Sequence, residues 1–499
     1  MWILLISITA VTIFILLKKY GNSSLPPGPP GVPLLGNALE IRDAPFLWLK
    51  LDEYAQTYGS IFTIRLLGRP AIVLSDPDIV TELFEKRAVN FANRPLFMMA
   101  KLVGWTEAIL FVPYGPRLHF QSLQIQELRK LMKRLVQEPE AFLRHAHLYA
   151  GAVSIRMTYG HTVRSFDDIF MQEAEEFMKV LNEGMLLIDF AAPALMPGRW
   201  LVEMIPLLRF VPVWFPGATF KRKAKEWAES TNRHRQAPFD YVVKNLAEGT
   251  AEPSFTSKLL DPEDGREVSE SEKEMIKIVA SGLYAAGADT TVSLLQSFFL
   301  AMTLHPHIQP KAQAEIDAYL AFSDQACSPT RILTIADREL LPYTHAVVSE
   351  LVRWHPVANT TTRYTQEDEI IGQYIIPKGT MVIGNLWSML HKPDIYADPE
   401  NFWPERFLGE NPPLDPSAYA FGFGRRICPG IHIAQQSLWI TISNILANFT
   451  INKLRTVDGE ELTPPETYTA DILSRPQPFE CSIKPRSAAS QSFVNEVEL

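Results

Sequence analysis

The feature that most constrains this chain is one cysteine placed in a glycine-rich loop directly before a long apolar stretch. The loop reads Phe-Gly-Phe-Gly-Arg-Arg-Ile-Cys-Pro-Gly over residues 421–430, and Cys428 is its cysteine. Residues 431–449 are mostly apolar, which predicts a buried helix. A thiolate at the start of that helix meets free N–H groups and the positive end of the helix dipole, which favour the ionised sulfur by about 0.3 to 1 kcal/mol. The loop therefore predicts a ligating cysteine; a buried, inert cysteine is the alternative.

Three further residues of the loop suit a flat ligand that carries carboxylates. Gly424 and Gly430 let the backbone pass close beneath such a ligand, where any Cβ would collide. Arg426, two residues before the cysteine, offers a guanidinium to a carboxylate. The loop is thus predicted to hold a planar, anionic ligand next to the sulfur.

Length and composition limit the remaining possibilities. The chain has 499 residues, of which 47% are hydrophobic, enough for a sizeable core. Its three cysteines, Cys327, Cys428 and Cys481, are too few for a disulfide framework and fit a reducing compartment. The formal net charge of −9 argues against nucleic acid as a partner. No linker rich in Gly or Ser divides residues 36–485, so we predict one large domain there.

The N-terminal segment predicts a membrane anchor over residues 1–20. An uncharged, mostly apolar run from Trp2 to Leu17 is followed by Lys18 and Lys19. Lysines after the run, with none before it, place the downstream chain in the cytosol. A cleaved signal peptide is the alternative, but its basic residues should precede the apolar stretch. We therefore expect a single-pass anchor in the endoplasmic reticulum membrane.

Two segments outside the body are predicted to lack helices and strands. Residues 21–35 contain the stretch Leu-Pro-Pro-Gly-Pro-Pro-Gly-Val-Pro, which cannot form a helix and makes a stiff hinge between anchor and body. An SH3-type ligand is the alternative interpretation of these prolines. Residues 486–499 are polar and predicted to be a disordered tail.

The body is predicted to be mainly α-helical, with small β-sheets near both ends. Residues 61–74 predict a hairpin of two strands, and residues 364–383 are β-like with a turn. Asp76 is the predicted cap of a helix that starts at Pro77 and continues through Phe84. Most of the chain after this helix has helical periodicity.

A long buried helix is predicted over residues 275–304, and its middle holds residues that are unfavourable there. The stretch 285–291 reads Ala-Ala-Gly-Ala-Asp-Thr-Thr. Gly287 costs about 1 kcal/mol relative to alanine in a helix interior, and a buried Asp289 must find a partner. Such residues indicate a functional stretch, although small residues also let helices pack closely.

Glu350 and Arg353 form an i, i+3 charge pair on another predicted helix. The apolar neighbours Val347, Leu351 and Trp354 predict that the pair is buried. An exposed pair would contribute under about 0.5 kcal/mol, whereas the loss of one partner of a buried pair costs about 3 to 5 kcal/mol. The pair is predicted to be structural.

Taken together, these motifs resemble those of the cytochromes P450. Phe421, Gly424, Arg426, Cys428 and Gly430 match the haem-binding loop of that family. The resemblance implies the cytochrome P450 fold, haem b as cofactor, and Cys428 as the axial ligand of its iron. Within the family, the sequence looks like fungal microsomal enzymes of the O-methylsterigmatocystin oxidoreductase type.

The resemblance also assigns roles to the predicted helix with the glycine and acid. Residues 285–291 are similar to the distal I helix, where a local opening of the helix leaves room for dioxygen and water. By that resemblance, Thr290 hydrogen-bonds the oxygen that is activated, and Asp289 helps relay protons to it.

Three more resemblances lie outside the loop and this helix. The pair Glu350 and Arg353 is similar to the ExxR pair, with Arg406 in Phe-Trp-Pro-Glu-Arg-Phe as its third member. Arg363 lies where many members contact a haem propionate. The apolar, proline-marked residues 185–217 resemble a region that covers the substrate pocket and touches the bilayer; core packing is the alternative.

The chain departs from the family pattern in two places. After Gly115 the family has a helix with Trp-x-x-x-Arg, both contacting a propionate, but here Leu118 and Ser122 stand at these positions and about one helix of chain is absent. Residues 357–362 replace a stretch that usually carries prolines and a histidine and roofs the pocket. Inference of the substrate from relatives is therefore unsafe.

The implied function is that of a haem-thiolate monooxygenase that hydroxylates or epoxidises a small apolar molecule with O2, in secondary-metabolite biosynthesis. Because the chain has no flavin or nicotinamide motif, two electrons must come through a separate NADPH-cytochrome P450 reductase. The basic residues within 129–134 are a possible contact for it, or else a solvated helix face.

Two other functions stay open at the level of the sequence. The shortened segment after Gly115 could leave a haem-poor, catalytically impaired protein. A haem enzyme could also rearrange its substrate without external electrons, but the retained pair Asp289 and Thr290 favours oxygen activation.

Overall fold

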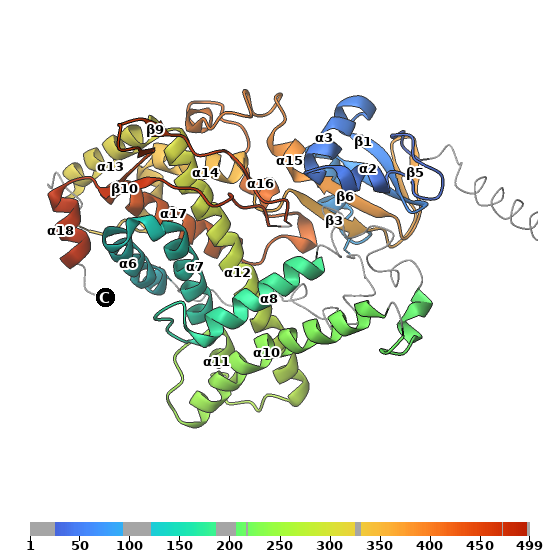
Figure 1. Ribbon diagram of the computed structural model, residues 1–499, viewed down its shortest axis with the longest axis horizontal. Helices are drawn as coiled ribbons and strands as arrows, with labels where there is room; N and C mark the ends of the chain where they lie inside the picture. Colours follow the sequence, from blue (N-terminus) through green and yellow to red (C-terminus); the bar gives the residue numbers. More distant parts are fainter. Residues whose placement is uncertain are drawn as a thin grey trace, which may run out of the picture.

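The computed structural model describes residues 25–92, 121–185, 206–215, 218–324, 331–471 and 473–496, and its elements are mostly helices with small sheets. The predicted mainly α fold with small β-sheets is therefore confirmed (Figure 1). The predicted membrane anchor over residues 1–20 lies outside the described residues. Among the described helices, one is long and apolar enough to cross a membrane, α12, and most of it is buried inside the protein.

Four helices form the centre of the helical part. They are α6 (Gln121–Gln137), α7 (Phe142–Tyr159), α12 (Glu270–Leu304) and α17 (Ile431–Asn448). Helix α6 packs on α7 and α17, and α12 packs on the same two helices (Figure 1). The predicted helices over 275–304 and 431–449 are thus confirmed, with α12 starting earlier because Ser269 and Glu272 form a capping box.

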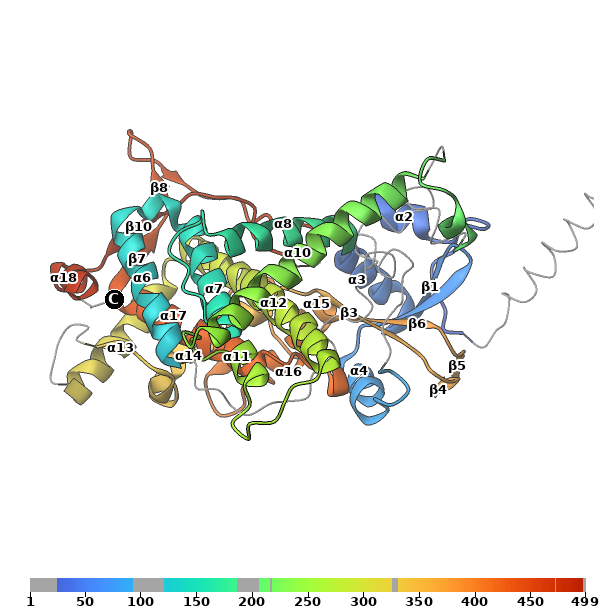
Figure 2. The same cartoon turned by 90° about the horizontal axis from the view of Figure 1, so that it is seen from below.

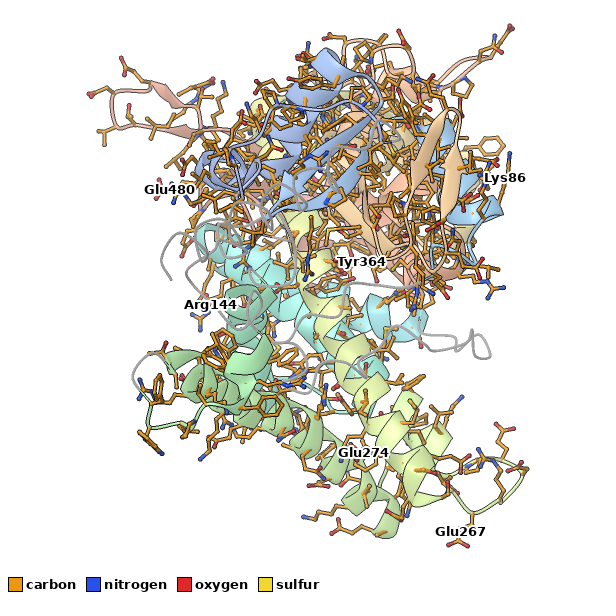
Figure 3. All side chains as sticks on the ribbon, turned by 90° about the vertical axis from the view of Figure 1, so that its right-hand side faces the viewer. Lys86, Arg144, Glu267, Glu274, Tyr364 and Glu480 are labelled. Atoms are coloured by element: carbon orange, nitrogen blue, oxygen red, sulfur yellow. The ribbon has the colours of Figure 1, made fainter. Side chains whose placement is uncertain are left out.

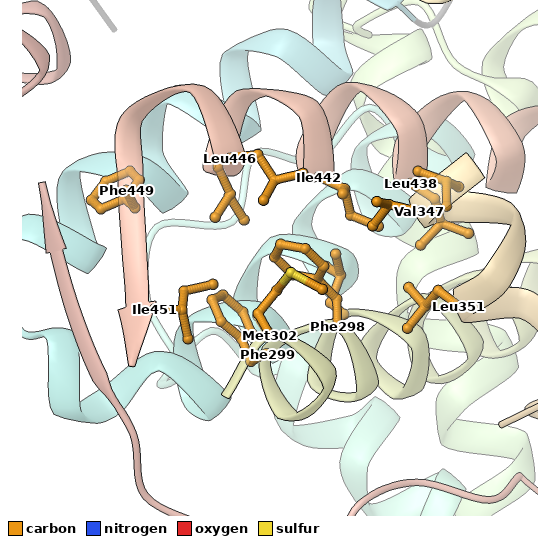
Figure 4. Close-up of a cluster of buried hydrophobic side chains, with 14 of the residues drawn as sticks. Phe298, Phe299, Met302, Val347, Leu351, Leu438, Ile442, Leu446, Phe449 and Ile451 are labelled. Atoms are coloured by element: carbon orange, nitrogen blue, oxygen red, sulfur yellow. The ribbon is translucent and has the colours of Figure 1, made fainter. Parts of the chain in front are cut away.

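The largest apolar core lies where α12 and α17 meet α14 (Pro342–Trp354) and the strand β7 (Phe449–Asn452). Figure 4 shows Phe298 and Met302 of α12 facing Ile442 and Leu446 of α17, with Leu351 of α14 beside them. These side chains are almost wholly removed from water, and each contributes about 1.5 to 3 kcal/mol of burial energy. This core fixes α12 and α17 relative to each other, so it also fixes the loop that precedes α17.

A four-stranded sheet forms the second part of the body. Its order is β1 (Ile61–Leu66), β2 (Arg69–Leu74), β6 (Met381–Asn385) and β3 (Thr360–Tyr364). The antiparallel β1–β2 pair confirms the predicted hairpin, and β2 pairs with β6 in parallel. Figure 3 shows Tyr364, at the end of β3, on this sheet side and Arg144 of α7 on the helical side. Helices α2 (Ala38–Asp43) and α3 (Leu47–Tyr58) lie beside the sheet (Figure 1).

The remaining strands form three two-stranded sheets. They pair β4 (Glu369–Ile371) with β5 (Tyr374–Ile376), β7 with β10 (Ser482–Pro485), and β8 (Leu454–Arg455) with β9 (Glu461–Leu462). The β-like character predicted for residues 364–383 is thus borne out by β3 to β6. The shorter helices are α11 (Phe255–Leu260), α13 (Ile308–Asp324), α15 (Leu386–Leu390) and α16 (Ser417–Ala420).

Asp76 caps α4 (Pro77–Thr81) as predicted. Its carboxylate accepts hydrogen bonds from the N–H groups of Asp78 and Ile79. The helix does not continue regularly through Phe84, because the chain widens into a π-helical turn, η1, over Glu82–Lys86. This turn places Phe84 against the cysteine loop.

Two long helices lie across α12 on the side opposite the core. They are α8 (Ile169–Met185) and α10 (Thr219–Ala247), which pack on each other (Figure 2). Residues 206–215 precede α10, and Phe210, Val213, Trp214 and Phe215 are exposed there, Trp214 by 78%. Core packing, the alternative for the apolar residues 185–217, does not apply to these four side chains.

The prediction of a disordered tail over residues 486–499 is wrong for most of the segment. Residues Ala488–Glu496 form helix α18, which packs on α6 and α17. Arg486 holds the entry to this helix through an ion pair with Asp317 at 2.5 Å, and Ser487 accepts a hydrogen bond from the Ser490 N–H. Val494 is buried against the core. These long-range contacts order a segment whose local composition is polar.

Candidate functional site

The cysteine loop is a compact turn stacked on the start of α17. The Cys428 N–H donates to the Phe421 carbonyl at 2.7 Å, and Gly424–Arg426 form a short 3-10 turn, η7. Helix α17 begins at Ile431, three residues after the sulfur. Burial raises the pKa of the Cys428 thiol, and a hydrogen bond from the Gly430 N–H lowers it. Since burial is the larger cause, the start of the helix does not by itself give the ionised thiol that the sequence predicts. A metal cation bound to the sulfur would favour the thiolate.

The two loop glycines serve different purposes. Gly424 has a φ of +53°, and a Cβ there would collide with the carbonyl oxygen of Phe84. Gly424 is therefore required by the packing of the loop on η1, and the close approach of a ligand to its backbone stays a prediction. A Cβ at Gly430 would lie 3.8 Å from the Cys428 sulfur, so Gly430 borders the sulfur; its predicted position beneath a ligand stays a prediction.

Phe84 connects the loop to the predicted propionate ligand Arg363. The guanidinium of Arg363 lies 5.3 Å from the centre of the Phe84 ring, and the rings of Phe84 and Phe423 are 6.2 Å apart. Arg363 is buried and donates to Thr361 and to the Thr362 carbonyl. The sequence offered no signal for Phe84 beyond its apolar character, because its partners lie hundreds of residues away.

Arg426, the other predicted propionate ligand, is held in place by a hydrogen bond to the backbone. Its Nε donates to the Ala92 carbonyl at 2.7 Å. Burial lowers the pKa of the Arg426 guanidinium, so a carboxylate bound beside it would offset the burial of its charge. Phe421 lies half-buried and accepts the Cys428 N–H through its backbone, so its contribution to the loop comes from the main chain.

Exposed apolar residues flank the sulfur along the chain and also interrupt the buried middle of α12. Helix α17 is buried from Ser437 onward, yet Ile427 and Ile433 beside Cys428 are 38% and 37% exposed. In the middle of α12, Ala286 and Gly287 are also exposed. Exposed apolar surface, a half-buried sulfur donor and a buried guanidinium together suit a flat apolar macrocycle with carboxylates, so the residues present fit haem.

Asp289 and Thr290 occupy the same stretch of α12 but have different environments. Asp289 is buried, and burial raises the pKa of its carboxyl, whereas the charges of Arg475 and His147 lower it. The Thr290 hydroxyl donates to the Ala286 carbonyl at 2.7 Å. Helix α12 is continuous through Gly287, so the local opening expected from the resemblance is absent. No hydrogen bond joins Asp289 or Thr290 to the cysteine loop within the described residues.

The predicted charge triad is fully assembled. Arg353 donates to both oxygens of Glu350 at 2.8 Å, and Arg406 donates to one of them at 3.0 Å. The Trp403 N–H donates to the same carboxylate. All three charged side chains are buried, which supports the structural role predicted for them.

The basic residues within 129–134 are only partly exposed. None of Arg129, Lys130, Lys133 and Arg134 is fully exposed. Lys130 pairs with Glu127 at 2.8 Å, and burial lowers the pKa of Arg134. A contact with a reductase and a solvated helix face therefore both stay open for these partly exposed residues.

Some predicted positions lie outside the described residues. They are the segment 93–120, which includes Gly115 and Leu118, and Cys327. Ser122 is described, in the first turn of α6, and is exposed. One residue beside the site was missed by the sequence, His147 of α7, because its helix carries no recognisable motif and only the fold brings it near Asp289.

The comparisons with known proteins agree with this geometry. A family model described as Cytochrome P450 matches residues 26–483. A cytochrome P450 monooxygenase of Armillaria gallica is 36% identical, and the alignment covers 99% of each chain. Cytochrome P450 monooxygenase 208 of Postia placenta is 36% identical over 96% of this chain and 93% of its own. Cytochrome P450 monooxygenase ppsD of Aspergillus oryzae is 32% identical over 95% of this chain and 91% of its own.

These matches cover nearly the whole chain and include the cysteine loop, α12 and the charge triad. The family holds haem iron through a cysteine thiolate and incorporates oxygen from O2 with electrons from a redox partner. This chain belongs to the cytochrome P450 family of haem-thiolate monooxygenases.

Proposed function

We propose that this protein hydroxylates or epoxidises a small apolar molecule in secondary-metabolite biosynthesis, with electrons from NADPH-cytochrome P450 reductase. The observation that carries the proposal is the half-buried thiol of Cys428 beside the exposed apolar residues Ile427 and Ile433. Fungal relatives of matching length support the class of reaction.

In this proposal Cys428 is the iron ligand, and Arg426 and Arg363 hold the propionates of the haem. When bound, the haem supplies the activation of O2 by two electrons. The chain itself controls protons and water around it. Burial raises the pKa of Asp289, which suits a carboxyl that holds a proton and passes it on, and Thr290 supplies the neighbouring hydroxyl.

Replacement of the cysteines tests the iron ligand. The reduced protein with carbon monoxide should show the absorption band that is typical of thiolate-ligated haem. Cys428→Ser should abolish this band, whereas Cys481→Ser and Cys327→Ser should keep it. Cys481 is a matched control because it is buried in the core and burial raises the pKa of its thiol to about 12. A band that survives in Cys428→Ser overturns the assignment.

We further propose that residues 1–20 anchor the protein in the endoplasmic reticulum membrane, with the body in the cytosol. The exposed side chains Phe210, Val213 and Trp214 support a second contact of the body with the bilayer. A chain that lacks residues 1–24 should lose its resistance to alkaline carbonate extraction from microsomes. Full extraction of the intact chain would contradict the anchor.

A second candidate, a haem-poor and catalytically impaired protein, is favoured by one observation. The alignment with the relative from Armillaria gallica extends over 524 positions, more than the 499 residues of this chain, so gaps fall within it. A helix missing after Gly115 would account for some of these gaps. Each lost hydrogen bond to a propionate is worth about 1.5 to 3 kcal/mol.

Haem content discriminates between the two candidates. We expect that a version with a full-length helix inserted after Gly115 holds more haem per protein, and loses it more slowly, than the chain as it stands. Equal occupancy and equal loss rates would show that the shorter segment is harmless.

A further inference from the structure

Asp289 needs a supply of protons if it has the role proposed for it above, on which this inference rests. Asp289 is 6% exposed, and within the described residues its carboxylate accepts no hydrogen bond. A buried acid that gives up protons repeatedly needs a path by which they are replaced from solvent. The described side chains whose charges act on Asp289 include His147 of α7, which is suited to that task.

The packing of α7 and α8 on α12 brings His147 near the turn of α12 that carries Asp289. Ser154 of α7 donates to the Tyr284 carbonyl of α12 at 2.9 Å, which fixes the contact of the two helices. His147 lies two turns before Ser154, on the same face of α7. Asp289 lies one turn after Ala285, which packs against Phe177 of α8. The junction of α7, α8 and α12 therefore surrounds Asp289.

Exposure increases stepwise from Asp289 outward through this junction. The side chain of His147 is 26% exposed, and its Nδ1 lies 3.6 Å from Glu175 of α8, whose side chain is 48% exposed. The Phe166 ring meets the imidazole edge to face at 5.9 Å and covers another side of it. The order Asp289, His147, Glu175 thus leads from the interior to solvent.

We propose that His147 is a positioning residue for proton supply: it delivers solvent protons to Asp289, and Glu175 orients its ring. The imidazolium gives its Nε2 proton to a carboxylate oxygen of Asp289 through a bridging water. The neutral ring, still protonated at Nδ1, then turns its bare Nε2 toward solvent beside Glu175, takes a proton there and turns back. One proton moves inward per cycle, and no covalent bond other than N–H and O–H changes.

The charges around the pair suit this exchange. His147 is influenced by Asp289, Glu175 and Arg475, and Asp289 by Arg475, His147 and Asp471. Burial lowers the pKa of His147 and raises that of Asp289, so the two values approach each other. A smaller difference between the two pKa values makes proton transfer in both directions easier.

The first test measures the coupling of the two residues without turnover. The full-length haem protein with isotope-labelled histidine is titrated by NMR in its reduced, carbon monoxide-bound form, and His147→Gln identifies the resonance. Because the Asp289 carboxylate favours the imidazolium, Asp289→Asn should lower the pKa of His147. An unchanged titration of His147 in Asp289→Asn overturns the proposal.

The second test measures the consequence with reductase and NADPH, and without added substrate. His147→Gln should increase the peroxide released per NADPH several-fold, and His147→Gln with Asp289→Asn should be no worse than Asp289→Asn alone. In the wild type the peroxide fraction should rise as the pH passes upward through the pKa of His147, and His147→Gln should lack this dependence. His145→Gln is the control, since His145 lies on α7 but contacts the Glu138 carbonyl instead.

The outcomes separate the two proposals. If Asp289→Asn raises peroxide release and His147→Gln does not, the relay is wrong while the role of Asp289 stands. If Asp289→Asn has no effect, the role of Asp289 falls and the relay falls with it.

Discussion

Two buried carboxylates, Glu350 of α14 and Asp289 of α12, differ in the hydrogen bonds that they accept. Glu350 accepts four hydrogen bonds, from Arg353, Arg406 and the Trp403 N–H, and both of its oxygens are satisfied. The carboxylate of Asp289 accepts none within the described residues, and burial raises its pKa. A fully paired acid stabilises one arrangement of the chain, whereas an acid without such partners can change its protonation state at little structural cost.

The largest expected effect is the loss of stability in Glu350→Gln. The amide removes the charge that compensates Arg353 and Arg406, so we expect the free energy of unfolding to fall by about 3 to 5 kcal/mol. Denaturant unfolding of the haem protein measures it. Glu339→Gln is the control, because Glu339 pairs with Arg338 in a largely exposed position, where pairs contribute under about 1 kcal/mol. A loss in Glu350→Gln no greater than in the control would break the comparison.

Substitution of Gly424 in the cysteine loop and of Gly287 in α12 should differ in its effect on stability. Gly424→Ala places a Cβ against the Phe84 carbonyl at a positive φ, and we expect a loss of about 1 to 3 kcal/mol. Gly287→Ala meets the Ser154 side chain, whose hydroxyl lies 2.7 Å from the new Cβ. Displacement of this hydroxyl from the Tyr284 carbonyl costs about 0.5 to 1.5 kcal/mol, which offsets a gain of about 0.5 to 1 kcal/mol of helix propensity. Thermal unfolding of both variants should therefore show a clear loss only for Gly424→Ala. Equal losses would mean that α12 is packed as tightly at Gly287 as the cysteine loop is at Gly424.

Asp289→Asn should change stability in the direction opposite to Glu350→Gln. Because the folded-state pKa of Asp289 is raised, the folded protein holds this proton more tightly than the unfolded chain. Stability from this group is present below the ordinary pKa of aspartate and is lost as the pH rises through the folded pKa. At pH 8 Asp289→Asn should be more stable than the wild type, and the difference should shrink as the pH is lowered. A variant that is less stable at pH 8 would indicate a hidden partner for the carboxylate.

The sequence predicted those features that are encoded locally. The β1–β2 hairpin, the Asp76 cap and the cysteine loop each follow from neighbouring residues, and Glu350 with Arg353 from helical spacing. The resemblance to a known family added Arg406, which no local pattern places beside Glu350.

The features that were missed depend on contacts between distant segments. Phe84 reaches Phe423 and Arg363 only because the sheet, η1 and the loop converge. Helix α18 is ordered by Arg486 and Asp317, which a polar composition does not reveal. The packing requirement for Gly424 was missed for the same cause, since the atom that excludes a Cβ belongs to another part of the chain.

The smallest effect on stability, and the sharpest on function, is expected for Thr290→Ala. The Thr290 hydroxyl donates back to the Ala286 carbonyl, a bond that adds nothing to the backbone ladder of α12, so the fold should keep its stability within about 0.5 kcal/mol. Beside the exposed residues of α12, this hydroxyl is the donor placed to act with Asp289, and its loss should raise the peroxide released per NADPH several-fold.

Thr291→Ala is the matched control, because its hydroxyl makes the same kind of bond, to the Gly287 carbonyl at 2.9 Å. If both variants behave like the wild type, proton control depends on neither hydroxyl, and Asp289 would have to act alone or through water. If only Thr290→Ala releases more peroxide, the division holds: Glu350 maintains the fold, and the face of α12 with Asp289 and Thr290 controls protons.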